Sequence, residues 1–129
     1  MRNTIVLLIA AVVIGCSGTT TPGPNANQGK LAMEEFSAML KQLPLDKRQP
    51  PTKMAEFEAV EPMVPSAGLL LKQKAIVYQW GQTLKEGSNA ILVYEAKAET
   101  DGGWVLLQDG TVKKMTADEF KAAPKAGKK

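Results

Sequence analysis

The chain has 129 residues, of which 44% are hydrophobic and 22% charged, with a formal net charge of +3, one cysteine and no histidine. This length accommodates one small domain, and a single cysteine excludes an internal disulfide. The absence of histidine also excludes the common zinc-ligand sets and the Ser-His-Asp and Cys-His catalytic arrangements.

The N-terminal residues have the pattern of an export signal. Arg2 precedes an apolar run from Ile5 to Ile14. In a helix this run would span about 15 Å, half of a ~30 Å hydrocarbon core, which is too short for a membrane span. A basic residue before a short apolar run is typical of a signal peptide. The run ends in Val13-Ile14-Gly15-Cys16, which resembles the lipobox of bacterial lipoproteins.

The lipobox resemblance implies that Cys16 is the lipid attachment site. In bacterial lipoproteins the thiol is linked to diacylglycerol, the signal peptide is removed, and the new amino terminus is acylated, for example with palmitate. Residues 1–15 would be the signal peptide, and a lipid anchor would hold the protein on a membrane of the bacterial cell envelope. The domain would lie in the periplasm or at the cell surface. Ser17, in place of an aspartate that retains some lipoproteins at the inner membrane, favours the outer membrane.

The next two segments differ in composition. Residues 17–29 carry no large apolar side chain, so they cannot offset their ordering entropy, and we expect residues 16–29 to be the lipidated cysteine and a flexible tether. Residues 30–43 have helical periodicity, with Pro44 after them. Their apolar positions are Met33, Phe36, Leu40 and Leu43. This face predicts packing on a sheet, and binding in a partner's groove is the alternative.

Residues 44–68 are rich in proline, which disfavours long regular elements. The prolines are Pro44, Pro50, Pro51, Pro62 and Pro65. We predict a stiff connector with one or two helical turns between Lys53 and Val60, in which Phe57 and Val60 face inward.

From Leu69 onward the pattern is typical of strands. Apolar, β-branched and aromatic runs occupy residues 69–80, 90–96, 104–107 and 111–115. Asp109-Gly110 joins the last two and predicts a type I′ hairpin. Thr116 and Glu119 then fit a capping box that opens a short helix over residues 117–123.

These elements predict one α+β domain over residues 30–123. It would be a small three- or four-stranded antiparallel sheet with the N-terminal helix packed on it and a short C-terminal helix. Residues 124–129 would be a basic disordered tail. Four lysines lie near this end, at Lys121, Lys125, Lys128 and Lys129. Without them acidic residues outnumber basic ones, so the charge balance does not indicate a nucleic-acid partner.

Residues 91–120 resemble a segment of prepilin-like proteins and of small lipoproteins of unknown function. In that segment a Tyr-Glu strand leads through a glycine-rich loop to an Asp-Gly hairpin. The matching positions are Tyr94, Glu95, Gly102, Gly103, Val105, Leu106, Asp109, Gly110 and Val112. The prepilin-like proteins usually carry a histidine in the loop and begin with a pilin helix, whereas this chain has a lipobox. The resemblance therefore implies the hairpin and no pilus role.

Acidic residues offer the only candidate chemistry. They cluster as Glu56/Glu58/Glu61, Glu95/Glu99/Asp101 and Asp109/Asp118/Glu119. A carboxylate pair is the requirement of a glycosidase, so a small hydrolase is an alternative. Such pairs also arise by chance, and nucleotide-binding glycine motifs and calcium loops are absent from the sequence. We expect the protein not to be an enzyme and to have no cofactor and no metal site.

Aromatic residues are the best candidates for binding. Tyr78, Trp80, Tyr94 and Trp104 fall on three neighbouring predicted strands, where they could line one binding face or simply pack in the core. We predict a non-enzymatic, lipid-anchored domain that scaffolds or binds another envelope component. An alternative is an attachment protein that links the membrane to the cell wall through its lysine-rich C-terminus.

Overall fold

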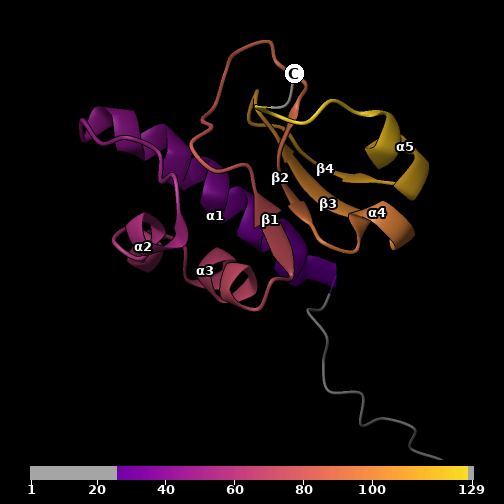
Figure 1. Cartoon of the computed structure of the whole chain (residues 1–129), viewed down its shortest axis with the longest axis horizontal. Coiled ribbons are helices and arrows are strands. Elements are labelled where there is room, and N and C mark those ends of the chain that lie inside the picture. The colour runs from indigo at the N-terminus through magenta and orange to yellow at the C-terminus, as the bar shows by residue number, and fades with distance from the viewer. Residues whose placement is uncertain (1–25, 128–129) are drawn as a thin grey trace, which may run out of the picture.

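The computed structural model describes residues 26–127 (Figure 1). Strands β1 (Ile76–Tyr78), β2 (Ile91–Glu95), β3 (Gly103–Leu107) and β4 (Val112–Met115) form one antiparallel sheet in chain order. The long helix α1 (Ala26–Leu45) packs on one face, and the short helix α5 (Ala117–Ala122) lies on the other. The predicted α+β class and arrangement are confirmed. The lipobox Val13-Ile14-Gly15-Cys16 lies outside the described residues.

Helix α1 supplies the main core. The predicted apolar face, Met33, Phe36, Leu40 and Leu43, is fully buried. Phe36 stacks on Phe57 with ring centroids 5.7 Å apart and lies 4.9 Å from Tyr78. The helix begins four residues before the predicted start, so residues 26–29 belong to the domain and not to a tether. It also continues through Pro44 to Leu45.

The connector contains more helix than the prolines predict. Helix α2 (Met54–Phe57) is short, and Phe57 and Val60 are buried as expected. A turn of 3₁₀ helix (Glu61–Met63) then leads to α3 (Pro65–Lys72). The prediction of a strand from Leu69 is therefore wrong as far as Lys72, although β1 begins at Ile76 within the predicted run.

The first turn of helix α3 and its buried face explain why residues 65–72 are helical. Pro65 occupies the first helical turn, where its missing N–H is not needed. The N–H groups of Ser66 and Ala67 both donate to Glu35 Oε2 of α1 at 2.9 Å. Ala67, Leu70 and Leu71 are buried at helical spacing. A carboxylate from a distant helix thus caps α3, which a local sequence pattern does not reveal.

A β-bulge sorts the side chains of β2 between the two faces of the sheet. Ile91 pairs with Leu107 and Val93 pairs with Leu106, so the register shifts between Ile91 and Val93. Leu92 and Val93 consequently both join the core under α1. The opposite face holds a smaller cluster with α5, composed of Ile91, Ala98, Val105, Leu107, Met115 and Phe120. Between β2 and β3 the chain forms a single helical turn, α4 (Ala98–Asp101).

The β3–β4 hairpin turns at Asp109-Gly110, but its type differs from the prediction. Gly110 has φ 94°, whereas Asp109 has a negative φ, which excludes type I′. The Gly110 N–H donates to Leu107 O and the Leu107 N–H to Thr111 O, both at 2.9 Å, which is the pattern of a three-residue loop with a glycine bulge. The Thr111 N–H also donates to Asp109 Oδ1 at 2.9 Å. This bond lowers the pKa of Asp109.

The C-terminal helix and the segment after it are both ordered. The capping box is confirmed: Glu119 N–H donates to Thr116 Oγ1 at 3.2 Å, and Thr116 N–H donates to Glu119 Oε2 at 3.4 Å. The predicted tail from 124 is wrong up to residue 126. Ile91 N–H donates to Pro124 O and Ala126 N–H donates to Ile91 O, both at 2.8 Å, and Ala126 is buried. These bonds add the segment to β2.

Candidate functional site

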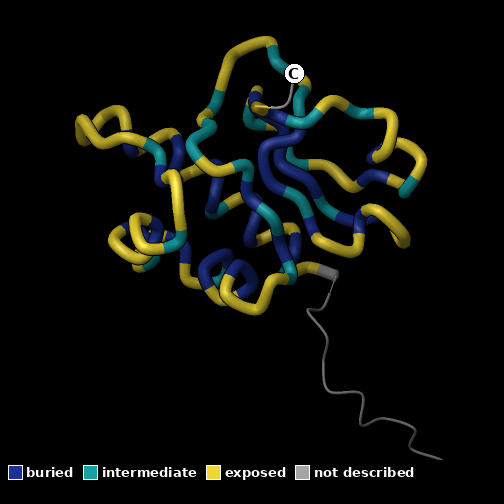
Figure 2. The backbone as a smooth tube through the Cα atoms, in the orientation of Figure 1, coloured by how far each residue is buried: buried dark blue, intermediate teal, exposed yellow. Residues whose placement is uncertain are grey.

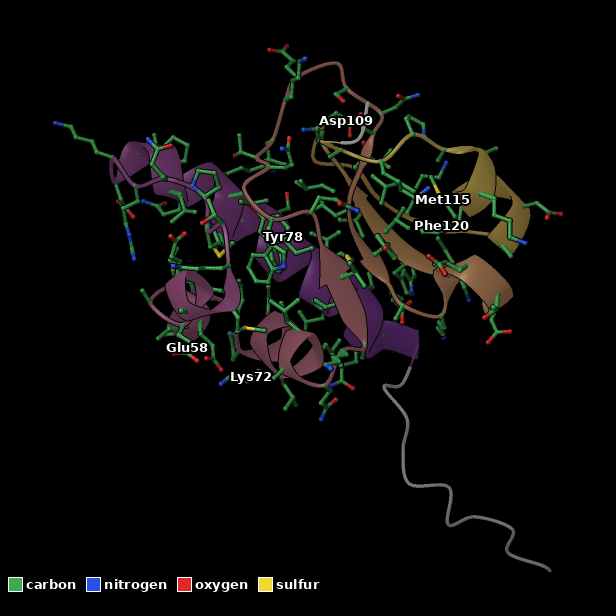
Figure 3. The ribbon with its side chains drawn as sticks, viewed as in Figure 1. Glu58, Lys72, Tyr78, Asp109, Met115 and Phe120 are labelled. Carbon is green, nitrogen blue, oxygen red and sulfur yellow. The ribbon has the colours of Figure 1, made fainter. Side chains whose placement is uncertain are left out.

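Two of the four candidate aromatic residues lie together: Tyr78 packs on Phe36 of α1, and Trp80 packs on Tyr78 and Phe57. Tyr78 is buried, and its hydroxyl donates to Gln82 O. Burial raises the pKa of Tyr78, so the hydroxyl stays protonated. Trp80 is 37% exposed, and its ring lies edge-on to Tyr78 at 5.1 Å and to Phe57 at 6.4 Å. Figure 3 shows Tyr78 between α1 and the two short helices.

The other two aromatic residues lie elsewhere. Tyr94 is on the α5 face, with its ring 4.8 Å from Phe120. Burial, together with the charge of Glu99, raises the pKa of Tyr94. Trp104 is half-buried on the α1 face, where Lys30 Nζ lies 5.8 Å from its ring.

The four aromatic residues therefore do not line one face, and the alternative of core packing holds for Tyr78. Val77 pairs with Tyr94 and Tyr78 pairs with Val93. Since consecutive strand residues point to opposite faces, Tyr78 and Tyr94 are separated by the sheet. Binding through Trp80 stays a prediction.

A shallow cleft adjoins Trp80 at the C-terminal end of α1. Its volume is about 420 Å³, and we name it the Arg48 cleft after one of its lining residues, which are Arg48, Gln49, Pro50, Pro51, Glu56, Ala59 and Val60. Trp80 does not line the cleft, but the backbone N–H of the next residue, Gly81, donates to Pro51 O at 2.9 Å, and the Trp80 ring packs on Phe57 next to Glu56. Residues 44–63, which include the cleft, are mostly exposed (Figure 2).

The Arg48 cleft presents both signs of charge around an apolar base. Arg48 is exposed. Its backbone N–H donates to Leu43 O at 2.8 Å, and this bond holds residue 48 next to the C-terminal end of α1. The Glu56 carboxylate accepts the N–H and the hydroxyl of Thr52, both at 2.8 Å. The backbone bond from Thr52 is the main cause that lowers the pKa of Glu56, so this side chain stays negative. Pro51 and Val60 are buried beneath them.

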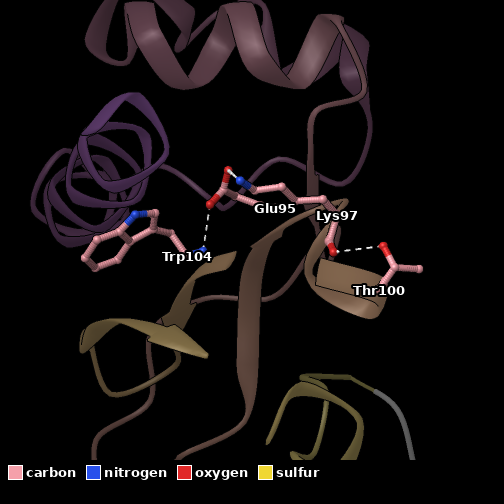
Figure 4. Close-up of polar contacts among 4 residues, drawn as sticks. All are labelled: Glu95, Lys97, Thr100 and Trp104. Atoms are coloured by element: carbon pink, nitrogen blue, oxygen red, sulfur yellow. Dashed lines mark hydrogen bonds and ion pairs between the residues drawn. The ribbon is translucent and has the colours of Figure 1, made fainter. Parts of the chain in front are cut away.

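At the opposite end of α1, a buried carboxylate of β2 packs against the helix; the sequence placed it in an acidic cluster and in the Tyr-Glu segment, with no structural role. Glu95 is 5% exposed, and the backbone N–H of Trp104 donates to its Oε1 at 2.7 Å (Figure 4). A Cβ built on Gly29 would lie 2.7 Å from Glu95 Cδ, and one on Gly103 would lie 3.0 Å from Oε1. Lys97 Nζ is 4.0 Å from Oε2.

Glu95 therefore fastens the first turn of α1 to the sheet. The start of a helix carries a partial positive charge, which stabilises a carboxylate there. Two glycines provide the space for the carboxylate. A glutamate at the end of the apolar strand run Ile91–Glu95 is the sequence signal that points to this arrangement, since a charged residue is rarely buried without partners.

The remaining acidic candidates are dispersed. Glu58 and Glu61 line a hollow of about 310 Å³ with Pro62 and Pro65, and Lys72 Nζ lies 2.7 Å from Glu61 Oε1. Figure 3 labels Glu58, which follows α2, and Lys72, the last residue of α3. Within residues 26–127 we find no group of three or more His, Cys, Asp or Glu side chains suited to a metal ion. Over the same range, no helix has the length and apolar character needed to cross a bilayer.

Comparisons with protein-family models, with curated proteins and with solved structures find no match to this chain. The resemblance of residues 91–120 to small lipoproteins and prepilin-like proteins therefore stays a prediction. The lipobox pattern and the geometry of the two ends of α1 are the features of the chain that point to a function.

Proposed function

We propose that this protein is a bacterial envelope lipoprotein, anchored through Cys16, whose domain binds another envelope protein at Trp80 and the Arg48 cleft. The observation that carries the proposal is that α1 separates the end of the domain nearest to the anchor from the end that carries the cleft. The chain enters the helix at Ala26, and the cleft lies beyond Leu45. The 20 residues of the helix span about 30 Å. An anchor before Ala26 would thus leave the cleft facing away from the membrane.

The side chains around the cleft support protein binding. Tryptophan and arginine concentrate binding energy at protein interfaces. Trp80 is held edge-on by two buried rings, so little side-chain entropy would be lost when it is covered. Arg48 and Glu56 border an apolar base, which suits a peptide segment with an apolar side chain flanked by charges.

A photo-crosslinking amino acid at position 80 of the full chain tests this surface in intact cells. We expect one discrete adduct with an envelope protein, and we expect Arg48→Ala to weaken it without lowering the melting temperature. The matched control is the same crosslinker at exposed Thr100 in α4. Equal adducts from positions 80 and 100, or an adduct that Arg48→Ala leaves unchanged, would contradict the proposal.

The anchor is tested separately by metabolic labelling with palmitate. The wild-type chain should incorporate the label and fractionate with membranes, whereas Cys16→Ser should do neither. Label retained by Cys16→Ser would show that another residue is acylated and would contradict the role assigned to Cys16.

One structural observation favours attachment to the cell wall as a second candidate function. The start of α1 contacts Glu95 at one end of β2, and residues 124–126 bond to Ile91 at the other end. Figure 1 shows the described chain leaving the molecule at separate ends. A link through Lys129 would therefore pull across the sheet. Muramidase digestion of purified cell wall should release the chain, and recovery in the detergent fraction alone would contradict this function.

A further inference from the structure

Two leucines are exposed near the point where the chain enters the domain. Leu31 on α1 is 46% exposed, and Leu69 on α3 is 48% exposed. Both belong to helices that pack against each other, since Glu35 of α1 caps the start of α3. Exposed aliphatic side chains that gather on one surface, rather than scatter singly, mark a candidate interaction site.

Contacts place both leucines at the same end of the molecule. Leu31 and Ser66 line one hollow of about 430 Å³ together with Asn27 and Gln28 of the first turn of α1. Leu69 follows Ser66 by three residues and so lies on the same side of α3. The chain then returns toward the start of α1, because Ala96 N–H donates to Ala75 O beside Glu95 and Gly29.

We propose that Leu31 and Leu69 rest on the bilayer that holds the lipid on Cys16. This inference depends on the proposed function, because it takes the anchor as given. Ten residues of chain lead from Cys16 to Ala26, and they cannot exceed about 35 Å even when fully extended. Leu31 lies about one and a half helical turns after that entry point, and Leu69 lies on the adjoining side of α3, so the anchor brings both side chains toward the membrane.

The anchor makes a weak contact sufficient. Once the lipid is inserted, docking of the domain is an intramolecular step at high effective concentration. Apolar side chains of a docked surface enter the boundary between headgroups and acyl chains by ~5–10 Å. The two leucines on adjacent helices thus need only to orient the domain on the bilayer. The Arg48 cleft at the far end of α1 would then face away from the membrane.

The contact is apolar and not electrostatic. The nearby charges balance in number: Lys30 Nζ lies 3.8 Å from Glu34 Oε1, Lys72 Nζ lies 2.7 Å from Glu61 Oε1, and exposed Lys74 is offset by the carboxylate of Glu35. These pairs leave little net positive charge to attract anionic lipid. The domain should therefore dock equally well on vesicles of phosphatidylcholine and of phosphatidylglycerol.

Fluorescence quenching on the lipidated full chain tests the inference. A Cys16 whose sulfur is thioether-linked to diacylglycerol has no free thiol, so Leu31→Cys, Leu69→Cys and Leu45→Cys each provide a single site for a maleimide fluorophore. Leu45 is the matched control, because it is 76% exposed at the far end of the same helix as Leu31. With a nitroxide on the lipid headgroup, we expect quenching at positions 31 and 69 to exceed that at 45 by about twofold or more, given the depth of docked side chains.

Each contrary outcome has a separate meaning. Equal quenching at all three positions would overturn the bilayer contact while leaving the anchor intact. Quenching that requires phosphatidylglycerol would overturn the apolar contact in favour of a charge-driven one. Reaction of the maleimide with Cys16 in the wild-type chain would contradict the anchor itself, and with it the proposed function.

Discussion

The two ends of α1 are built in opposite ways. At its start, Gly29 packs directly on the buried carboxylate of Glu95, which also accepts the N–H of Trp104. At its other end, Leu45 is 76% exposed, and the chain continues into the open cleft beside Trp80. Around Gly29 the first end has little space for a larger side chain, whereas the second end displays side chains that the fold does not need. Under the proposed function, stability and recognition thus belong to different ends of one helix.

The largest effect should follow removal of the buried carboxylate. Glu95→Ala leaves the Trp104 N–H without its acceptor and opens a cavity between Gly29 and Gly103. We expect the free energy of unfolding to fall by about 2–3 kcal/mol, measured by urea denaturation. Glu99→Ala on exposed α4 is the control and should stay within about 0.5 kcal/mol of wild type. Equal effects of the two substitutions would show that the carboxylate does not hold this end.

A methyl group at Gly29 should destabilise the helix that it would ordinarily favour. Alanine is better than glycine in a helix by about 1 kcal/mol. Here the added Cβ would lie 2.7 Å from Glu95 Cδ, so we expect Gly29→Ala to cost about 2 kcal/mol through overpacking. In the Glu95→Ala background this cost should disappear, as a double-mutant cycle would measure. A stabilising Gly29→Ala in the wild-type background would refute the close packing.

Substitution at the open end should affect stability less. Trp80→Ala removes the two edge-on ring contacts of a partly exposed side chain. We expect thermal unfolding to report a loss of about 1 kcal/mol. Arg48→Ala, whose side chain is exposed, should change stability by less than about 0.5 kcal/mol. Losses as large as those at Glu95 would erase the contrast between the ends.

The smallest expected effect is on the stability of the folded protein at acidic pH. The hydrogen bonds from Thr52 hold the pKa of Glu56 below its ordinary value of 4.5. The folded state therefore binds this proton less readily than the unfolded state, so the stabilisation is present above pH 4.5 and is lost as the pH falls through the lowered pKa. Glu56→Gln should flatten this part of the pH profile of unfolding. An unchanged acid limb in that variant would show that Glu56 makes no such contribution.

Local patterns predicted the elements whose partners are close in sequence. The capping box at Thr116, the Asp109-Gly110 turn and the buried face of α1 each depend on residues a few positions apart, and each is present. The same reasoning gave the wrong hairpin type, because only Gly110, and not Asp109, takes a positive φ.

Elements that depend on distant partners were not predictable in this way. The run Leu69-Leu70-Leu71 suits a strand or a helix, and Glu35 of α1 caps the helix start. Strand register decides that Tyr94 leaves the face of Tyr78. Hydrogen bonds to Ile91 order residues that resemble a tail. At the candidate site, Trp80 was named from its residue type, while its neighbours Arg48 and Pro51 join it only through the fold.

The mass of the mature chain extracted from membranes tests the central claim most directly, because the orientation of both ends of α1 depends on the anchor. We predict a chain that begins at Cys16 and carries the mass of a thioether-linked diacylglycerol with an acylated amino terminus. Cys16→Ser should lack this added mass. A membrane-extracted chain that retains residues 1–15 with an unmodified Cys16 would contradict the account.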